Sequence, residues 1–250
     1  MFKVSIITIT YNSEETLIET IDSVLNQTYK NIEYIIVDGA STDDTVSIVH
    51  SYKDKITKFV SEKDKGLYDA LNKGISMATG DVVGILHSDD FYTNHHVIQN
   101  VVNAFKTGNA DAVYADLFYV DKDDTHKIHR KWKSGHYKHG MFRHGWMPPH
   151  PTFFVKREIY EKYGHFNLDL VSAADYELML RFIHKHQIKL AYLPEFIIKM
   201  RVGGKSNLNL KNRIRANKED RKAWKINGLK PYFYTTYLKP LRKIIQLFKR

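Results

Sequence analysis

Two adjacent carboxylates, Asp89 and Asp90, follow the hydrophobic segment at residues 82–86. Their charges repel each other at the end of an expected buried strand, so the pair does nothing to stabilise the fold. Hard oxygen ligands of this kind suit Mg²⁺ or Mn²⁺, which bind through one or two carboxylates together with substrate phosphates. The alternative is a solvated turn in which Asp90 caps the next helix. A lone Asp-Asp pair favours that alternative, because short motifs recur by chance.

Residues that suit a nucleotide follow two other hydrophobic runs. Tyr11 offers a ring on which a base can stack, and Asp38 can accept a hydrogen bond from a base N–H. Lys65, with Lys63, precedes an expected helix N-terminus, where cations and amide donors can hold phosphate. The alternatives are packing at the rim for Tyr11 and a turn for Asp38. No G-x-G-x-x-G motif follows the first run and no Walker loop is present, which disfavours dinucleotide dehydrogenases and P-loop enzymes.

The hydrophobic pattern indicates which elements position these residues. Strands are expected at residues 4–10, 32–39, 56–62, 81–87 and 111–120, and helices at residues 12–27, 41–52, 66–80 and 94–108. The first helix has a start signal that resembles a capping box, Asn12 with Glu15. This alternation predicts an α/β fold with a mostly parallel sheet flanked by helices. Ligands bind beyond the carboxyl ends of such strands, so residues 10–12, 38–39 and 88–90 should meet at one edge.

The second half of the chain is less regular. Residues 121–160 are rich in His, Gly and aromatic residues with weak periodicity, as is typical of a loop that faces a substrate. No histidine pair has the spacing of a helical zinc site, which favours an acceptor loop over a metal centre. His150, between Pro149 and Pro151, is the candidate on the acceptor side. A helix that begins near Asp175 and further strands follow, at residues 172–188 and 189–207.

Four stretches together resemble family 2 glycosyltransferases, and the likeness covers about residues 3–203. They are "VSIITITYN", "QTYKNIEYIIVDGASTDDT", "SEKDKGLYDALNKGISMATGDVVGILHSDD" and "HPTFFVKREIYEKYGHFNLDL…AADYELMLR". The likeness is to bacterial enzymes of exopolysaccharide, O-antigen, capsule and colanic-acid type. It implies a GT-A fold over residues 1–205, with a nucleotide-binding half at about 1–120 and an acceptor half at about 121–205. Residues 206–250 would form a basic amphipathic helical tail.

The resemblance also implies roles for individual residues. Thr10, Tyr11 and Asp38 would hold the base, usually uracil, although Ile9 stands where many members have Pro. Lys65 would contact the base or diphosphate, and Asp89 the ribose or sugar. Asp90 would bind the metal, Mn²⁺ or Mg²⁺, and Asp175 would be the general base of an inverting enzyme.

One carboxylate is enough for inversion, because a metal assists the departing diphosphate. Pattern alone favours an N-cap or a first-turn acid stabilised by the helix dipole for Asp175, and the resemblance reverses that preference. Glu177 is the backup base, although it lies two residues away and points elsewhere on a helix.

Charge is concentrated at the C-terminus. Residues 201–250 hold 15 Lys and Arg against Glu219 and Asp220, whereas residues 1–200 hold 23 against 26 acids. Two tail helices are expected, at about residues 207–225 and 232–250. The second has an apolar stripe flanked by basic residues that include Lys239, so it fits a helix lying on an anionic leaflet, and equally a core or dimer helix. The chain has no cysteine, no signal-peptide pattern and no unbroken apolar run long enough to span a membrane. The expected location is cytoplasmic, at the inner face of the plasma membrane.

The sequence therefore predicts an inverting, metal-dependent glycosyltransferase. It would move a sugar from a nucleotide diphosphate, expected to be UDP, to a glycan or lipid-linked acceptor of a bacterial surface polysaccharide. One alternative is a sugar nucleotidyltransferase, which would normally have a Gly-rich basic loop where this chain has the acidic "ITYNSEE". Another is a non-catalytic adaptor that binds membrane or nucleic acid, although nucleic acid is disfavoured because no recognised motif is present. Donor sugar, linkage and oligomeric state stay open.

Overall fold

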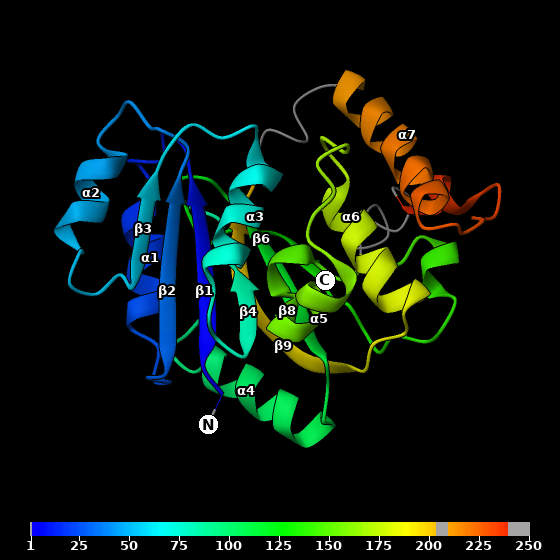
Figure 1. Cartoon of the computed structure of the whole chain (residues 1–250), viewed down its shortest axis with the longest axis horizontal. Coiled ribbons are helices and arrows are strands. Elements are labelled where there is room, and N and C mark those ends of the chain that lie inside the picture. Colours follow the sequence, from blue (N-terminus) through cyan, green and yellow to red (C-terminus); the bar gives the residue numbers. More distant parts are fainter. Residues whose placement is uncertain (1, 204–209, 240–250) are drawn as a thin grey trace.

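The computed structural model describes residues 2–203 and 210–239, and its central feature is one β-sheet with helices on both faces (Figure 1). Within that part of the chain the strand order is β3-β2-β1-β4-β8-β6-β9-β5, and β7 pairs with β6. The α/β architecture expected from the alternating pattern is confirmed.

The first half of the sheet is parallel. Its strands are β1 (Val4–Thr10), β2 (Ile32–Asp38), β3 (Lys58–Ser61) and β4 (Val82–Ile85), and all four point toward the upper edge of the view in Figure 1. The helices between them are α1 (Leu17–Leu25), α2 (Thr45–Ser51) and α3 (Leu67–Met77). These right-handed βαβ units bring the carboxyl ends of the strands to one edge.

The second half of the sheet mixes directions. Here β6 (Ala112–Val120) and β9 (Leu190–Arg201) are parallel, whereas β5 (Asp90–Tyr92), β7 (Ile128–Trp132) and β8 (Phe154–Lys156) pair antiparallel with their neighbours. Helices α4 (Val97–Gly108), α5 (Arg157–Tyr163) and α6 (Ala174–Met179) flank these strands. Short helical turns η1 (Met141–His144), η2 (His150–Thr152) and the π-helical η3 (Leu180–Lys185) complete this half.

Alternate residues of the central strands enter two separate cores. Val4 and Ile6 of β1 pack with α1 and α4 on one face, whereas Ile7 and Ile9 pack with α3 and α6 on the other. Both faces are covered, so these strands are mostly apolar, and their few polar residues, such as Ser5, Thr8 and Glu33, are buried too. The Phe154 ring packs directly on the backbone of β4 at Gly84, where an added Cβ would lie 2.3 Å from the ring.

Two local expectations are wrong. The capping box at Asn12 is absent: α1 begins at Leu17, and Asn12 adopts a positive φ and accepts a hydrogen bond from the Thr42 N–H at 2.9 Å. Asp90 is not a helix cap either, because it opens β5, and the next helix has His96 as its N-cap. A three-residue strand is too short to be seen as a period in the sequence.

The C-terminal helix α7 (Leu210–Ile226) packs against α6 and lies at the edge of the molecule in Figure 1. Its Trp224 is fully buried and donates a hydrogen bond to the Tyr176 hydroxyl at 2.9 Å. Lys239, which the sequence assigned to a lipid-facing basic flank, instead pairs with Asp220 at 2.8 Å. The rest of the second expected tail helix, residues 240–250, lies outside the described residues. No helix within residues 2–203 and 210–239 is long and apolar enough to cross a bilayer.

The packing of His184 on η3 predicts a loss of stability in acid. His184 is buried against Trp224 and His139, and burial, reinforced by His139 and Arg143, lowers its pKa to about 4. The folded state binds its proton less readily than the unfolded state, whose histidine has a pKa near 6.5. This contribution to stability is therefore complete above pH 6.5 and is lost as the pH falls toward 4.

We expect His184→Leu to flatten the fall of Tm between pH 6.5 and 4 in scanning calorimetry. The exposed control variant His95→Leu should keep the wild-type slope. An unchanged slope in His184→Leu would contradict the assignment.

Candidate active site

Hydrogen bonds join the three polar groups that the sequence places at one edge of the sheet. The Gly39 N–H donates to the Thr10 carbonyl at 2.9 Å, which ties the ends of β1 and β2 together. The hydroxyl oxygens of Ser13 and Ser88 lie 2.9 Å apart, which connects the loop after β1 to the segment after β4. The expected convergence of residues 10–12, 38–39 and 88–90 is therefore present in the structure.

Asp38 is fully buried at the end of β2 and organises the first part of this edge. Its carboxylate accepts hydrogen bonds from the Ser41 N–H at 3.0 Å, the Ser41 hydroxyl at 2.5 Å and the Ser61 hydroxyl at 2.6 Å. Close by, the buried Thr10 hydroxyl has no hydrogen-bond partner within the described residues, and the Tyr11 ring is 52% exposed. A half-exposed ring beside unsatisfied polar atoms suits a planar polar ligand.

Lys65 is hydrogen-bonded to Asp69 of α3 and not to Thr10, Tyr11 or Asp38. Its side chain is exposed before α3, and its backbone N–H donates to the Asp69 carboxylate at 3.0 Å. Its place beside the entrance to α3 agrees with a contact to a charged, solvent-facing part of a ligand.

Asp90 is the most unusual carboxylate in the described structure. It is fully buried, and neither carboxylate oxygen has a hydrogen-bond partner. Burial raises its pKa well above the usual value, the Asp89 charge adds to that rise, and Arg201 opposes it. The pKa of Asp89 is also raised by burial. An unpartnered buried charge is costly, so these carboxylates are poised for a positively charged ligand.

The backbone around the pair is held firmly even though its carboxylates are not. The Thr20 hydroxyl lies 3.0 and 2.8 Å from the carbonyl oxygens of Ser88 and Asp90. Arg201 donates to the Asp89 carbonyl at 2.6 Å and pairs with Glu19, so its guanidinium is already engaged. The scaffold fixes the main chain at both aspartates and leaves the two carboxylate oxygens of Asp90 without a hydrogen-bond partner within the described residues.

The donor set fits a hard divalent cation that brings other ligands with it. Asp89 and Asp90 supply oxygen atoms only, as Mg²⁺ and Mn²⁺ prefer. Residues 2–203 and 210–239 contain no group of three or more His, Asp or Glu side chains placed to enclose a metal by themselves. The remaining ligands would come from water or from a bound phosphate, which is how Mg²⁺ is usually held.

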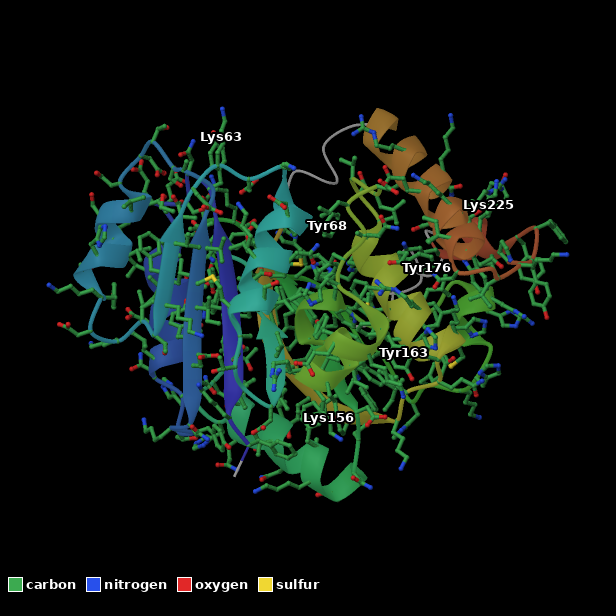
Figure 2. The ribbon with its side chains drawn as sticks, viewed as in Figure 1. Lys63, Tyr68, Lys156, Tyr163, Tyr176 and Lys225 are labelled. Atoms are coloured by element: carbon green, nitrogen blue, oxygen red, sulfur yellow. The ribbon has the colours of Figure 1, made fainter. Side chains whose placement is uncertain are left out.

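Asp175 lies in the first turn of α6, where it does not act as an N-cap. Its Oδ1 is 3.3 Å from the Tyr68 hydroxyl of α3, and its Oδ2 is 3.4 Å from Nδ1 of His150 on η2. The other ring nitrogen of His150, Nε2, is 3.2 Å from Nε2 of His87. Figure 2 shows Tyr68 on the side of α3 that faces α6. The base and acceptor-side candidates of the sequence are therefore in direct contact.

Burial and neighbouring charges shift the pKa values of His87 and Tyr68, two side chains of this group of contacts. Burial, reinforced by His150 and opposed by the Asp175 charge, lowers the pKa of His87 to about 3. Burial and the Asp175 charge raise the pKa of the Tyr68 hydroxyl. His87 is therefore neutral at physiological pH, and Tyr68 keeps its proton.

Glu177, the alternative base, is buried and committed to a structural role. Arg181 contacts both of its carboxylate oxygens at 3.0 Å, and the Asn227 amide donates to it at 2.9 Å. The sequence pattern assigns no role to Tyr68 or to His87. A tyrosine on an amphipathic helix carries no signal of function, and only the fold brings it to Asp175.

Because the Asp90 carboxylate is buried without a hydrogen-bond partner in the described structure, we predict that its charge destabilises the ligand-free fold. Asp90→Asn removes the charge and keeps the shape, so at pH 8 in chelator we expect a gain of about 1–2 kcal/mol, or roughly 3–6 °C in Tm. The exposed control variant Asp54→Asn should leave Tm within about 1 °C. A lower Tm for Asp90→Asn would mean that the carboxylate is stabilised by its surroundings.

The sequence has clear relatives. The model of Glycosyl transferase family 2 matches residues 5–164. An uncharacterized glycosyltransferase of Mycobacterium tuberculosis is 33% identical over 180 residues, which are 71% of this chain and 68% of that protein. The UDP-Glc:alpha-D-GlcNAc-diphosphoundecaprenol beta-1,3-glucosyltransferase WfaP of Escherichia coli is 38% identical over 121 residues, 48% of this chain and 47% of WfaP. The chain thus spans about half the length of WfaP.

Solved structures with the same fold agree. S. aureus TarS 1–349 in complex with UDP-GlcNAc has a TM-score of 0.68 at 18% identity, covering 90% of this chain and 65% of that chain. The mannosyltransferase PcManGT from Pyrobaculum calidifontis, in complex with GDP-Man and Mn²⁺, has a TM-score of 0.67 at 20% identity, covering 99% and 70%. At these identities the likeness concerns the fold alone. With the family model matching well over half of its residues, this chain belongs to glycosyl transferase family 2 and has the GT-A fold.

Proposed function

We propose that this family 2 glycosyltransferase transfers a sugar with inversion from a UDP-sugar to a glycan or lipid-linked acceptor, in the biosynthesis of a bacterial surface polysaccharide. The observation that carries the proposal is the buried Asp90 carboxylate, whose two oxygens have no partner within the described residues. A cation bound there with a diphosphate would satisfy both the carboxylate and the leaving group. WfaP is named for a UDP-Glc donor and a diphosphoundecaprenol-linked acceptor, which supports this choice of substrates.

The donor would lie along the carboxyl edge of the parallel strands. Thr10, Tyr11 and Asp38 hold the base, with the Tyr11 ring stacked on it and the polar atoms of Thr10 and Asp38 at its edge. Lys65 contacts the diphosphate or the base, and Asp89 the ribose or sugar. The nucleotide-binding half is then residues 1–120, and the acceptor half, residues 121–205, contributes His150 and Asp175.

The reaction needs one proton acceptor. Asp175 takes the proton of the acceptor hydroxyl while the hydroxyl oxygen forms its bond to the anomeric carbon. The bond from that carbon to the diphosphate oxygen breaks on the opposite face, and its electron pair leaves with UDP. Asp90 would hold Mn²⁺ or Mg²⁺, which supplies Lewis-acid stabilisation of the leaving diphosphate when bound. The loop after β1 contains Glu14 and Glu15 where a nucleotidyltransferase would need a basic phosphate loop.

The proposal predicts two variants that abolish transfer for different reasons. A thermal-shift screen of nucleotide sugars with Mn²⁺ first selects the donor, because ligand binding raises Tm. With that donor, Asp90→Ala should lose the Mn²⁺-dependent binding, whereas Asp175→Asn should bind the donor normally and lose at least about 100-fold in UDP release.

The exposed control variant Asp54→Ala should keep full activity. Full activity in Asp90→Ala or in Asp175→Asn would refute the role assigned to that residue.

We further propose that the C-terminal segment places the enzyme on an anionic membrane surface. Phe233 is 86% exposed and Tyr237 57% exposed, and with Tyr232 they line a hollow of about 360 Å³. Arg221 borders the hollow, and Lys225 projects from α7 nearby (Figure 2). Exposed aromatic rings among basic side chains suit the interface of an anionic bilayer. This agrees with a lipid-linked acceptor.

Replacing both exposed rings should weaken membrane binding without loss of folding. We expect Phe233→Ser/Tyr237→Ser to reduce co-sedimentation with vesicles of phosphatidylglycerol and phosphatidylcholine by about tenfold, since each ring buries apolar area. Ile18→Ser is the matched control, because Ile18 is 48% exposed on α1, outside this patch. Equal sedimentation of wild type and double variant at the same Tm would exclude this surface.

A further inference from the structure

The Asp175 carboxylate is held by two side chains from distant parts of the chain. Tyr68 reaches it from α3 and His150 from η2, at 3.3 and 3.4 Å, and His150 in turn meets His87 at 3.2 Å. Four different elements thus contribute to one continuous line of polar groups. We propose that Tyr68 and His150 are positioning residues that orient the Asp175 carboxylate, and that His87 fixes the tautomer of His150. This inference rests on the proposed role of Asp175 as the base.

The direction of each hydrogen bond follows from the chemistry of the groups. An ionised carboxylate can only accept, so the Tyr68 hydroxyl donates to Oδ1. Nδ1 of His150 lies 3.4 Å from Oδ2 in an ion-pair contact, and a proton on Nδ1 is the one that this contact favours. A neutral imidazole that carries its proton on Nδ1 has a lone pair on Nε2. His87 must then present an Nε2–H to that lone pair. The line runs from His87 through His150 to Asp175, with each donor facing an acceptor.

The geometry suits a base that waits for its substrate. The 3.3 Å hydrogen bond from Tyr68 is longer than usual and the 3.4 Å contact of His150 is an ion-pair distance, and such contacts commonly tighten only when substrate binds. With one donor on each oxygen, the carboxylate has a fixed orientation and still has free lone pairs for an acceptor hydroxyl. The side chain of Asp175 remains 22% exposed, which leaves a route for that hydroxyl.

His150 stands on a rigid support. The turn η2 places His150 between Pro149 and Pro151, whose rings restrict the backbone. The hydroxyl of the buried Thr152 lies 2.9 Å from the Pro149 carbonyl and 3.0 Å from the Ala115 carbonyl, which joins the turn to β6. Catalytic side chains that must keep a fixed direction need such support.

His87 links the Asp175 side of the site to the Asp89–Asp90 side, because it contacts His150 and lies next to Ser88 in the sequence. It directly precedes Ser88 and the Asp89–Asp90 pair, whose backbone is pinned by Thr20. The base and the donor-side carboxylates are therefore located by the same segment after β4. A displacement of that segment would move His87, and through His150 the carboxylate of Asp175.

Isosteric variants separate positioning from packing. His150→Asn keeps an N–H near the position of Nδ1, His150→Gln keeps one near Nε2, and Tyr68→Phe removes only a hydroxyl. We expect kcat to fall about 10- to 100-fold in His150→Gln and Tyr68→Phe and to stay within about fivefold of wild type in His150→Asn. The KM for the donor should not change in any of them.

The control variant is His126→Gln, an exposed histidine of the same segment, which should behave as wild type. Wild-type kcat in His150→Gln would overturn the proposal. Equal loss in His150→Asn and His150→Gln together with a raised KM would also overturn it, because His150 would then be a substrate contact.

A second measurement does not depend on turnover. Long-range ¹H–¹⁵N NMR of the imidazole rings, in metal-free protein, reports which nitrogen of His150 carries the proton. We expect the Nδ1–H form, which is the minor tautomer of free histidine, and its loss in Asp175→Ala. An Nε2–H form in wild type would reject the proposal. The expected tautomer together with full activity in Asp175→Asn would leave the line of contacts in place and reject the proposed base instead.

Discussion

The constraint on which the site depends is the burial of Asp90 without a partner. The backbone on either side of it is fixed by Thr20 and by Arg201, which contacts the Asp89 carbonyl and Glu19. A fold optimised for stability alone would place an apolar side chain there, or would turn Arg201 toward the carboxylate. In this structure the Arg201 guanidinium instead contacts the main chain at Asp89, and the Asp90 carboxylate oxygens have no hydrogen-bond partner within the described residues. The strand β5 is three residues long, begins at Asp90 and pairs with the last part of β9, so this short pairing fixes the backbone of Asp90.

Helix α6 connects this site to the C-terminal segment. Asp175 faces Tyr68 and His150, while the adjacent Tyr176 is covered by Trp224 of α7 and by the Lys239 ammonium, 4.0 Å from the centre of its ring. Lys239 is held by Asp220, and Ser172 at the start of the turn donates to Glu219 at 2.6 Å. The tail is therefore part of the packing around α6, the helix that carries Asp175. A segment bound to a membrane through Phe233 and Tyr237 would fix the helix that carries Asp175 relative to that surface.

The sequence predicts those parts of the molecule that depend on local pattern. The bounds of β1 follow from a largely β-branched run of residues, and the meeting of Asp38 with Thr10 follows from the rule that parallel strands end at one edge. Contacts between distant segments could not be predicted in this way. Tyr68 and Asp175 are 107 residues apart, and nothing in the α3 pattern distinguishes Tyr68 from a core aromatic. The switch of Asn12 from an expected helix cap to a positive-φ loop residue likewise depends on a partner, Thr42, that only the fold provides.

Asp175 and Glu177 lie in the same first turn of α6 but have different surroundings. Glu177 points into the core, where Arg181 occupies both of its oxygens and Asn227 adds a third donor, so no substrate hydroxyl can reach it. Asp175, two residues earlier, points toward α3 and η2, where it contacts the Tyr68 hydroxyl and the His150 imidazole. Residues at i and i+2 lie on different faces of a helix, so one turn can serve both needs. The ion pair of Glu177 anchors α6 to its own π-helical continuation, and that anchor keeps the first turn, with Asp175, directed at the edge of the sheet where Asp90 lies.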